Sequence, residues 1–408
     1  MKILVAHNRY QFAGGEDAVV QAESELLKLN GHKVLVLEVN NDEIVGAWRK
    51  AKAASSAIYS PASKKLVRAE IARFHPDVVH IHNFFPLLSP AVYDACRDAR
   101  VPVVQTLHNY RLGCPKATLF RNGKSCEDCI GKQVPWPSVV HGCYRGSRAQ
   151  STVVAAMIAL HRLRGTWWER VDAYIALTRF QKEKMVQAGL PPEKIYIKPN
   201  FVFDLNSLTD VNVANEYALF VGRLSEEKGV SILIDAYMQN DLCLPLKIVG
   251  DGPLRWSLQE RVQVAGLENA IKFIGQQDKS AVAALMRNAR FLVFPSIWYE
   301  GFPLTIAEAF ACSLPVLAPR LGSMAEIVED GVTGLLFEAG NSQQLADKVR
   351  WAKAHPMEMI GMGKNARRVY EAHYTPESNY QQLMTIYQQF ISSTLSNEAQ
   401  TVVSKITV

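Results

Sequence analysis

Short apolar runs alternate with helical patterns along most of this chain. Residues 2–7, 77–82 and 101–107 are each followed by a polar turn, and the same alternation returns from Tyr217 onward. Strands that alternate with helices form parallel sheets, because each crossover helix brings the chain back to the edge where the next strand begins. Ligands of such sheets bind at the carboxyl ends of the strands. We therefore predict an α/β protein whose binding residues follow its strands.

Length and composition limit the class of protein. The 408 residues suggest two or three domains, and 48% hydrophobic with 21% charged residues is typical of soluble globular proteins. The first apolar run is too short for a signal peptide. The longest one, residues 153–160, is far shorter than the ~20 residues that span a bilayer. We expect a cytoplasmic protein.

Charge is distributed unevenly. Residues 1–205 carry 28 Lys+Arg and 18 Asp+Glu, a net +10, whereas the remainder carries 17 and 21, a net −4. A basic first half favours an acidic partner, such as an anionic membrane surface or a lipid pyrophosphate, although surface charge that only solubilises gives the same count. The sequence contains no recognised nucleic-acid-binding motif, so we expect no nucleic acid partner.

Residues 294–319, FPSIWYEGFPLTIAEAFACSLPVLAP, predict a strand end, a turn, a helix and another strand. Pro303 suits the first helical position, because its missing N–H would have no partner there. The free N–H groups of Leu304, Thr305 and Ile306 then form an anion site. Glu300 precedes this helix and Glu308 lies on it. Two carboxylates around a phosphate site match a ligand with a central phosphate and hydroxyls at both ends, as in a nucleotide-sugar.

Two further strand ends carry polar groups. Arg223 and Lys228, in GRLSEEKG, follow a predicted strand at 217–221, where two cations can meet a diphosphate; solvated surface bases are the alternative. In the first half, Gly14 and Gly15 lie between strand and helix and let the backbone approach a ligand, unless they form an ordinary turn. The full G-x-G-x-x-G fingerprint is missing, which disfavours a dehydrogenase.

Three histidines, His7, His82 and His108, also fall at predicted strand ends. A histidine at such a position is more often structural than catalytic.

The spacing of Glu300 and Glu308 resembles the EX7E signature of the retaining glycosyltransferases of GT-B fold, family four. The flanking EGFPLTIAEAFACSLPVLA, GRLSEEKG, the TLHNYRL around His108 and the PNFV at Pro199 are similar to the family's motifs, with Asn109 where the family often has Asp. The resemblance covers nearly the whole chain except residues 114–150. It implies two Rossmann-like parallel-sheet domains that face a cleft.

The resemblance also implies roles for individual residues. It implies that Glu300 binds the donor sugar, that Glu308 binds the ribose, and that Arg223 and Lys228 bind the diphosphate. It also implies that His108 lies beside the reacting sugar. We predict four catalytic residues: His108, Arg223, Lys228 and Glu300. The predicted nucleotide-sugar site is Gly15, Arg223, Lys228, Gly275, Glu300, Phe302, Leu304, Thr305, Ile306 and Glu308. The predicted acceptor site is Gly14, Gly15, His82 and His108.

The expected function is transfer of a sugar from a UDP- or GDP-linked donor to a glycan or lipid-linked acceptor in surface polysaccharide or glycolipid synthesis. The resemblance implies retention of configuration and no catalytic metal. A nucleotide-sugar epimerase or a non-catalytic binding protein of the same fold are the alternatives. The expected domains are residues 1–205, with a Cys-rich insertion at 111–150, residues 206–375, and a helix at 376–395 that crosses back to the first domain.

Four cysteines in the insertion, Cys114, Cys126, Cys129 and Cys143, include a central C-x-x-C. This spacing fits a structural zinc, with an iron–sulfur cluster or uncoordinated thiols as alternatives. The next segment, residues 149–172, predicts one amphipathic helix in which Trp167 and Trp168 accompany several basic residues. Such a helix can lie on an anionic membrane at the inner face, or it can pack on its own domain.

Overall fold

The computed structural model describes residues 1–406 except 10–13, 41–54, 205–216 and 240–243, and it describes side chains up to Ile391. The chain forms two compact units. The first contains Met1–Thr118, Glu127–Pro199 and Asn379–Val408, and the second contains Leu119–Cys126 and Asn200–Ser378. We had placed the change of domain at 205–206, which lies outside the described residues. Each unit is an α/β structure, as predicted.

The first unit is built on a parallel sheet with the order β2-β1-β3-β4-β7-β8. The strand bounds are β1 Lys2–Arg9, β2 Lys33–Asn40, β3 Val78–Asn83, β4 Val103–Thr106, β7 Ala173–Ala176 and β8 Ile195–Ile197. The strand order reverses between β1 and β3, and polar residues cluster at their carboxyl ends. Such a reversal is where α/β sheets bind ligands.

Helices connect these strands. They are α1 Gly15–Leu29, α3 Pro61–Phe74, α4 Ala91–Ala99, α5 Pro137–Val140, α6 Arg148–Leu163, α7 Thr166–Glu169 and α8 Arg179–Gln187. Our single helix over 149–172 is wrong, because α6 ends at Leu163 and Gly165 adopts a left-handed φ of 68° before α7. A residue with a Cβ is strained at that φ, so the glycine divides the helix.

The second unit has a parallel sheet with the order β11-β10-β9-β12-β13-β14, the classic arrangement of dinucleotide-binding domains. Its strands are β9 Ala218–Val221, β10 Leu246–Val249, β11 Ile271–Gly275, β12 Phe291–Val293, β13 Val316–Pro319 and β14 Gly334–Phe337. A short hairpin, β5 Phe120–Arg121 with β6 Lys124–Ser125, groups with this unit. The order reverses between β9 and β12.

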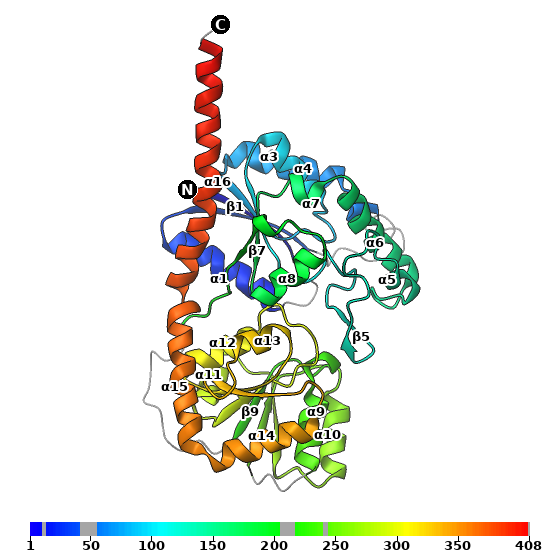
Figure 1. Ribbon diagram of the computed structural model, residues 1–408, viewed down its shortest axis with the longest axis vertical. Coiled ribbons are helices and arrows are strands. Elements are labelled where there is room, and N and C mark those ends of the chain that lie inside the picture. The colour runs from blue at the N-terminus through cyan, green and yellow to red at the C-terminus, as the bar shows by residue number, and fades with distance from the viewer. Residues whose placement is uncertain (10–13, 41–54, 205–216, 240–243, 407–408) are drawn as a thin grey trace. The chain divides into compact units, whose positions relative to one another are not determined.

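Figure 1 shows helices around the sheet of the second unit. Helix α14 contacts α9, and α15 contacts α12. The bounds are α9 Val230–Met238, α10 Arg255–Val264, α11 Lys279–Arg287, α12 Leu304–Ala311, α13 Gly322–Ile327, α14 Ser342–Ala354 and α15 Pro356–His373, with 3-10 turns at Pro192–Lys194 in the first unit and Glu226–Lys228 here. The strands are apolar and buried, so they hold the polar loops at their carboxyl ends in fixed places.

The last helix, α16, spans Pro376–Ile406 and is longer than the helix we predicted at 376–395. From Asn379 onward it belongs to the first unit. Its Leu383 and Tyr387 are fully buried in a core cluster with Ile3, Val78 and Val104. The end of the chain therefore completes the core of the domain that the beginning of the chain starts. Among the described helices, none is long and apolar enough to cross a membrane.

Candidate functional site

The predicted phosphate loop and the predicted acidic loop both lie at the strand-order reversal of the second unit. The loop with Arg223 and Lys228 follows β9, and the loop with Glu300 follows β12, the strand that pairs with β9. Gly229 fits one loop against the other, because it has a φ of 67° and a Cβ built on it would lie 2.0 Å from the Pro295 carbonyl oxygen. The sheet order thus brings together residues about seventy positions apart.

Lys228 and Glu300 form one ion pair. The Lys228 ammonium lies 2.7 Å from Glu300 Oε1, and the Ser296 hydroxyl donates to the same oxygen at 2.9 Å. Glu300 is 6% exposed, and its backbone carbonyl accepts from the Ser323 hydroxyl at 2.6 Å. These contacts fix the carboxylate at the carboxyl edge of the sheet. The sequence had assigned the two residues to different parts of a ligand.

The side chain of Arg223 is exposed, and the structure records no hydrogen bond or ion pair for it within the part of the chain that it describes. This guanidinium is therefore available to a ligand without giving up an internal partner.

The helix N-terminus behind Glu300 differs in detail from the prediction. Helix α12 begins at Leu304, and Pro303 is the N-cap residue with extended backbone rather than the first helical residue. The Ile306 N–H donates to the Pro303 carbonyl at 3.0 Å, so our prediction of a free N–H there is wrong. For the N–H groups of Leu304 and Thr305 the structure gives no partner within the described chain. Two N–H groups of the first turn are therefore left for a ligand.

Glu308 lies on α12, half-buried, and the described residues offer it no hydrogen bond or ion pair. Burial raises the pKa of its carboxyl above the usual value, while the charge of Lys279 acts in the opposite direction. A half-buried carboxyl without an internal partner is well suited to accept ligand hydroxyls.

The other residues that we predicted in this unit have mixed surroundings. Phe302 is buried and packs edge-on against Tyr374, with ring centroids 5.4 Å apart, so its side chain is largely structural. Gly275 ends β11 with a φ of 79°, in the left-handed region.

Sequence reasoning missed three residues of this site, Ser296, Trp298 and Ser323. The indole N–H of Trp298 is buried without a hydrogen-bond partner in the described structure, and its ring centroid lies 5.6 Å from the Lys228 ammonium. The signal was present, since Ser296 and Trp298 lie in the acidic stretch itself.

In the first unit, the glycine turn is acidic rather than phosphate-like. Helix α1 begins at Gly15, and the N–H of Gly14 donates to the Asp17 carboxylate at 2.9 Å. Asp17 also contacts His7 Nε2 at 2.8 Å. Among the described residues, nothing lies within 4 Å of a Cβ built on Gly14. Because a carboxylate already occupies this helix end, the turn favours hydroxyl groups over phosphate.

His82 and His108 contact each other, with His82 Nδ1 2.8 Å from His108 Nε2. His82 is only 3% exposed, and its place in the acceptor site stays a prediction. Its other nitrogen, Nε2, lies 3.3 Å from Glu23 Oε1, and Glu23 Oε2 is 2.9 Å from the Lys198 ammonium. Sequence reasoning missed Glu23 and Lys198, because charged residues in such patterns are normally exposed.

The same carboxylate belongs to the one group of potential metal ligands found in the described part of the chain, Glu23, His80 and His82. This group does not suit a dication. The Lys198 ammonium already neutralises Glu23, and the Tyr387 hydroxyl lies 2.6 Å from His80 Nδ1. A second positive charge there would be repelled by Lys198.

The four cysteines of the insertion are not gathered into a site. In the described structure, no three of these cysteines bring their sulfurs within ligand distance of one another. The arrangement does not fit a four-thiolate zinc site. Zinc remains a prediction from spacing, which elemental analysis of protein purified without added metal tests.

The side chain of Arg162 connects the insertion to other segments of the first unit. Its side chain, on α6, is 7% exposed and donates to the carbonyls of Ala188 at 2.8 Å and Leu112 at 3.3 Å. It also donates to the carbonyls of Lys132 and Gln133. Trp167 is likewise buried, at 1% exposure, whereas Trp168 is 36% exposed, so only one of the two predicted tryptophans is accessible to a membrane.

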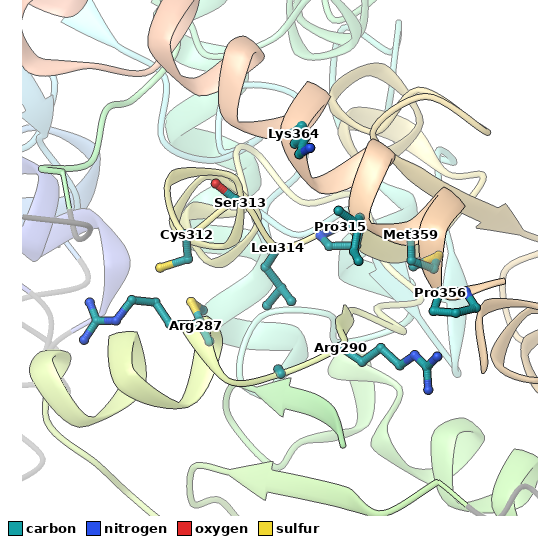
Figure 2. Close-up of a pocket in the computed structure, with 12 residues that line it drawn as sticks. Arg287, Arg290, Cys312, Ser313, Leu314, Pro315, Pro356, Met359 and Lys364 are labelled. Atoms are coloured by element: carbon teal, nitrogen blue, oxygen red, sulfur yellow. The ribbon is translucent and has the colours of Figure 1, made fainter. Parts of the chain in front are cut away.

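A separate pocket of about 390 Å³ lies in the second unit (Figure 2). Leu314 and Pro315 lie at its centre, with Arg287 and Arg290 on either side. Arg290 precedes β12 and Pro315 precedes β13, so this pocket is at the amino edge of the sheet, opposite the predicted site. Arg290 already donates to the Lys353 carbonyl at 3.0 Å. The pocket therefore lacks the convergent buried polar groups that orient a ligand.

Comparison with known families is consistent with this geometry. The model of the family described as Glycosyl transferases group 1 matches residues 209–369, and that of Glycosyltransferase Family 4 matches residues 13–203. Together the two matches span most of both units.

Individual relatives are more distant or match only in part. The chain is 27% identical to a phosphatidyl-myo-inositol mannosyltransferase of Mycobacterium leprae over 83% of each chain. It is 25% identical to an alpha-D-kanosaminyltransferase of Streptomyces kanamyceticus over 89% of each. An uncharacterized glycosyltransferase of Methanocaldococcus jannaschii is 41% identical, but the match covers only 33% of this chain and 37% of that protein.

Solved structures share the fold. HepE of Anabaena, in complex with UDP and glucose, superposes with a TM-score of 0.67 at 23% identity, covering 97% of this chain and 99% of the other. The sucrose-phosphate synthase of Thermosynechococcus elongatus gives 0.70 at 18% identity, covering 96% and 99%. Identities this low establish the fold and leave substrates open.

Proposed function

Because this chain belongs to the family four glycosyltransferases of GT-B fold, we propose that it transfers a sugar from a nucleotide-sugar to a glycan or lipid-linked acceptor with retention of anomeric configuration. One observation carries the proposal. The Lys228–Glu300 ion pair lies at the strand-order reversal of the second unit, where the loop with Arg223 and the loop that leads to α12 both leave the sheet. The relatives include a mannosyltransferase and a HepE structure with UDP-glucose, which supports a nucleotide-sugar donor.

Positive charge at this edge would stabilise the leaving diphosphate. Arg223 is exposed and available, and the N–H groups of Leu304 and Thr305 have no partner within the described chain. Negative charge grows on the diphosphate as the sugar bond breaks, so contacts to it are stronger in the transition state than in the ground state. These groups supply the charge that a divalent metal supplies in other sites, and we expect transfer to continue in excess chelator.

The Lys228–Glu300 pair would organise the donor sugar. Without ligand, the ammonium is bound to the carboxylate at 2.7 Å. A bound diphosphate would share the ammonium, while Ser296 keeps its bond to Glu300 and preserves the carboxylate's position. Glu300 then accepts from the sugar hydroxyls, and Glu308 accepts from the ribose.

We place the acceptor against the first unit, near Gly14, Gly15 and His108. The basic half of the chain favours an anionic lipid surface, and the exposed groups lie in the insertion. Trp136 is 57% exposed with Lys132 over its ring, and Arg148 donates to the carbonyl of Val140, which is 49% exposed. Residues 131–150 contain no acidic residue. This basic and apolar patch replaces Trp167 as the candidate membrane contact at the inner face.

The deciding experiment is mass spectrometry of products from a panel of UDP- and GDP-sugars, with and without lipid-linked and glycan acceptors. A glycosyltransferase gives an acceptor-dependent product. Conversion of the donor without acceptor would identify an epimerase, and binding without turnover of any donor would identify a non-catalytic protein. Co-sedimentation with anionic vesicles tests the patch: Trp136→Ser should reduce binding, and Trp256→Ser, an exposed tryptophan of the second unit, should not.

A further inference from the structure

A chain of four polar side chains runs from the interior of the first unit to the carboxyl edge of its sheet. Lys198 contacts Glu23 at 2.9 Å, Glu23 lies 3.3 Å from His82 Nε2, and His82 Nδ1 lies 2.8 Å from His108 Nε2. The first three side chains are at most 3% exposed, whereas His108 is half-buried. His108 is therefore the outer end of a buried chain.

The charge states along this chain are defined by their surroundings. Burial tends to raise the pKa of Glu23, but Lys198 and the two histidines outweigh it and hold the pKa well below its usual value. Burial lowers the pKa of His82 to about 3, and it holds the pKa of His108 well below the usual range, with His82, His80 and His7 adding to the effect and Glu23 opposing it. At neutral pH, Glu23 is a carboxylate and both histidines are neutral.

A neutral imidazole carries one proton, so its position follows from the neighbours. His82 Nε2 faces a carboxylate oxygen, and a lone pair there would be repelled, so this nitrogen carries the proton. His82 Nδ1 then has a lone pair and accepts from the N–H at His108 Nε2. His108 Nδ1 is left as a lone pair, and the described residues offer it no hydrogen bond.

We propose that Glu23 and His82 are positioning residues that place the proton of His108 on Nε2, so that His108 Nδ1 accepts a hydrogen bond from a sugar hydroxyl. The identity of the ligand rests on the proposed function, whereas the tautomer does not. His108 then recognises a hydroxyl donor and does not donate a proton to the ligand. A deoxy or fluoro analogue at the recognised hydroxyl should lose roughly three- to tenfold in kcat/KM, the range of one neutral hydrogen bond.

The tautomers can be measured directly by long-range nitrogen–proton NMR on the full chain labelled with ¹⁵N-histidine, with signals assigned by loss in His82→Asn and His108→Gln. We expect both His82 and His108 to be neutral with the proton on Nε2 at pH 7. His82→Asn keeps an oxygen acceptor where Nδ1 lies and should preserve the His108 tautomer. His82→Leu removes the acceptor and should give His108 a mixture of tautomers.

Activity distinguishes positioning from simple structure. His82→Leu should lower kcat/KM roughly tenfold, and His82→Asn should restore most of it. The matched control is His32→Gln. His32 belongs to the same unit but contacts Tyr380 and none of the four linked side chains. Both His82 variants leave the Glu23–Lys198 pair in place.

A proton on His108 Nδ1 in the unmodified protein, or an unchanged tautomer in His82→Leu, would overturn the proposal. If the tautomers behave as expected but no nucleotide-sugar is consumed, the proposed function fails alone.

Discussion

Lys228 and Glu300 share a 2.7 Å contact, and their burial differs from that of Arg223, which is exposed. This difference predicts different effects of mutation. Arg223→Ala should lower kcat/KM by about 10²-fold and leave the thermal midpoint unchanged, because only a transition-state contact is lost. Lys228→Ala should lower kcat/KM at least as much and also lower the midpoint, because a buried carboxylate loses its ion partner.

Steady-state kinetics and thermal unfolding measure both effects. Arg261→Ala, whose ion pair with Asp235 joins α10 to α9, is the control and should change neither. Near-normal kcat/KM in both site variants would remove these residues from the diphosphate site.

The raised pKa of Glu308 predicts how nucleotide affinity depends on pH. Burial raises the pKa of its carboxyl, so the neutral form accumulates at a higher pH than for an ordinary carboxyl. Accepting ribose hydroxyls requires the carboxylate, and nucleotide affinity should therefore fall as pH drops through this raised pKa. Glu308→Gln should weaken nucleotide binding about tenfold at pH 7, the range of a hydrogen bond to a charged group, and should flatten the pH dependence.

The effect on stability has the opposite sign. A carboxyl whose pKa is raised by folding costs stability above that pKa, so Glu308→Gln should unfold at an equal or higher temperature at pH 7, and the gain should vanish as pH falls below the ordinary carboxyl pKa.

Titration calorimetry with free nucleotide and with intact donor separates the roles of the two carboxylates, Glu300 and Glu308. Glu300→Gln should spare nucleotide binding and slow transfer, and equal losses for both ligands in both variants would contradict this division.

At the scale of the elements, the side chain of Arg162 joins the insertion to its neighbours. Arg162 donates to backbone carbonyls in three separate segments around Leu112, Lys132 and Ala188. Arg162→Met keeps much of the length but no donor, leaving buried carbonyls unpaired at about 1–3 kcal/mol each where water cannot replace the guanidinium. We expect rapid proteolysis within residues 111–150 and faster hydrogen exchange there. Arg164→Met, on the same α6–α7 segment but exposed, should behave like the unmodified protein.

The elements also show what the sequence could predict. The alternation of strands and helices and the position of the loops at the carboxyl edge follow from apolar periodicity. The Lys228–Glu300 contact, the Glu23–Lys198 pair and the Arg162 contacts do not. Each depends on which charged residues become buried together, and that depends on strand order, which periodicity leaves open. The sequence shows a glycine at position 165, but it does not show that this residue adopts a left-handed φ between α6 and α7.

At the scale of the whole chain, the packing of α16 into the first unit predicts the effect of a truncation. Residues 379–391 bury Leu383 and Tyr387 in the first unit, and the Asn379 amide donates to the Pro199 carbonyl at 2.7 Å. A chain that ends at Ser378 loses two large core side chains, each worth roughly 2–5 kcal/mol, which is a large part of typical domain stability. The first unit should unfold, while the second keeps its complete sheet and nucleotide affinity.

Hydrogen exchange and nucleotide titration of the truncated chain check this. A chain that ends at Ile391 is the control and should retain both units. Loss of nucleotide affinity together with the first unit would show that the second unit does not fold alone.

The position of α16 also sets an order of events during synthesis. Domains generally fold as they leave the ribosome, beginning at the N-terminus. Here the strands β1 to β8 are made first, but their core lacks Leu383 and Tyr387 until the last part of the chain is translated. The second unit has all its strands by Phe337 and can fold while the first still waits. The half that carries the basic patch is thus expected to complete its core last, although its synthesis begins first.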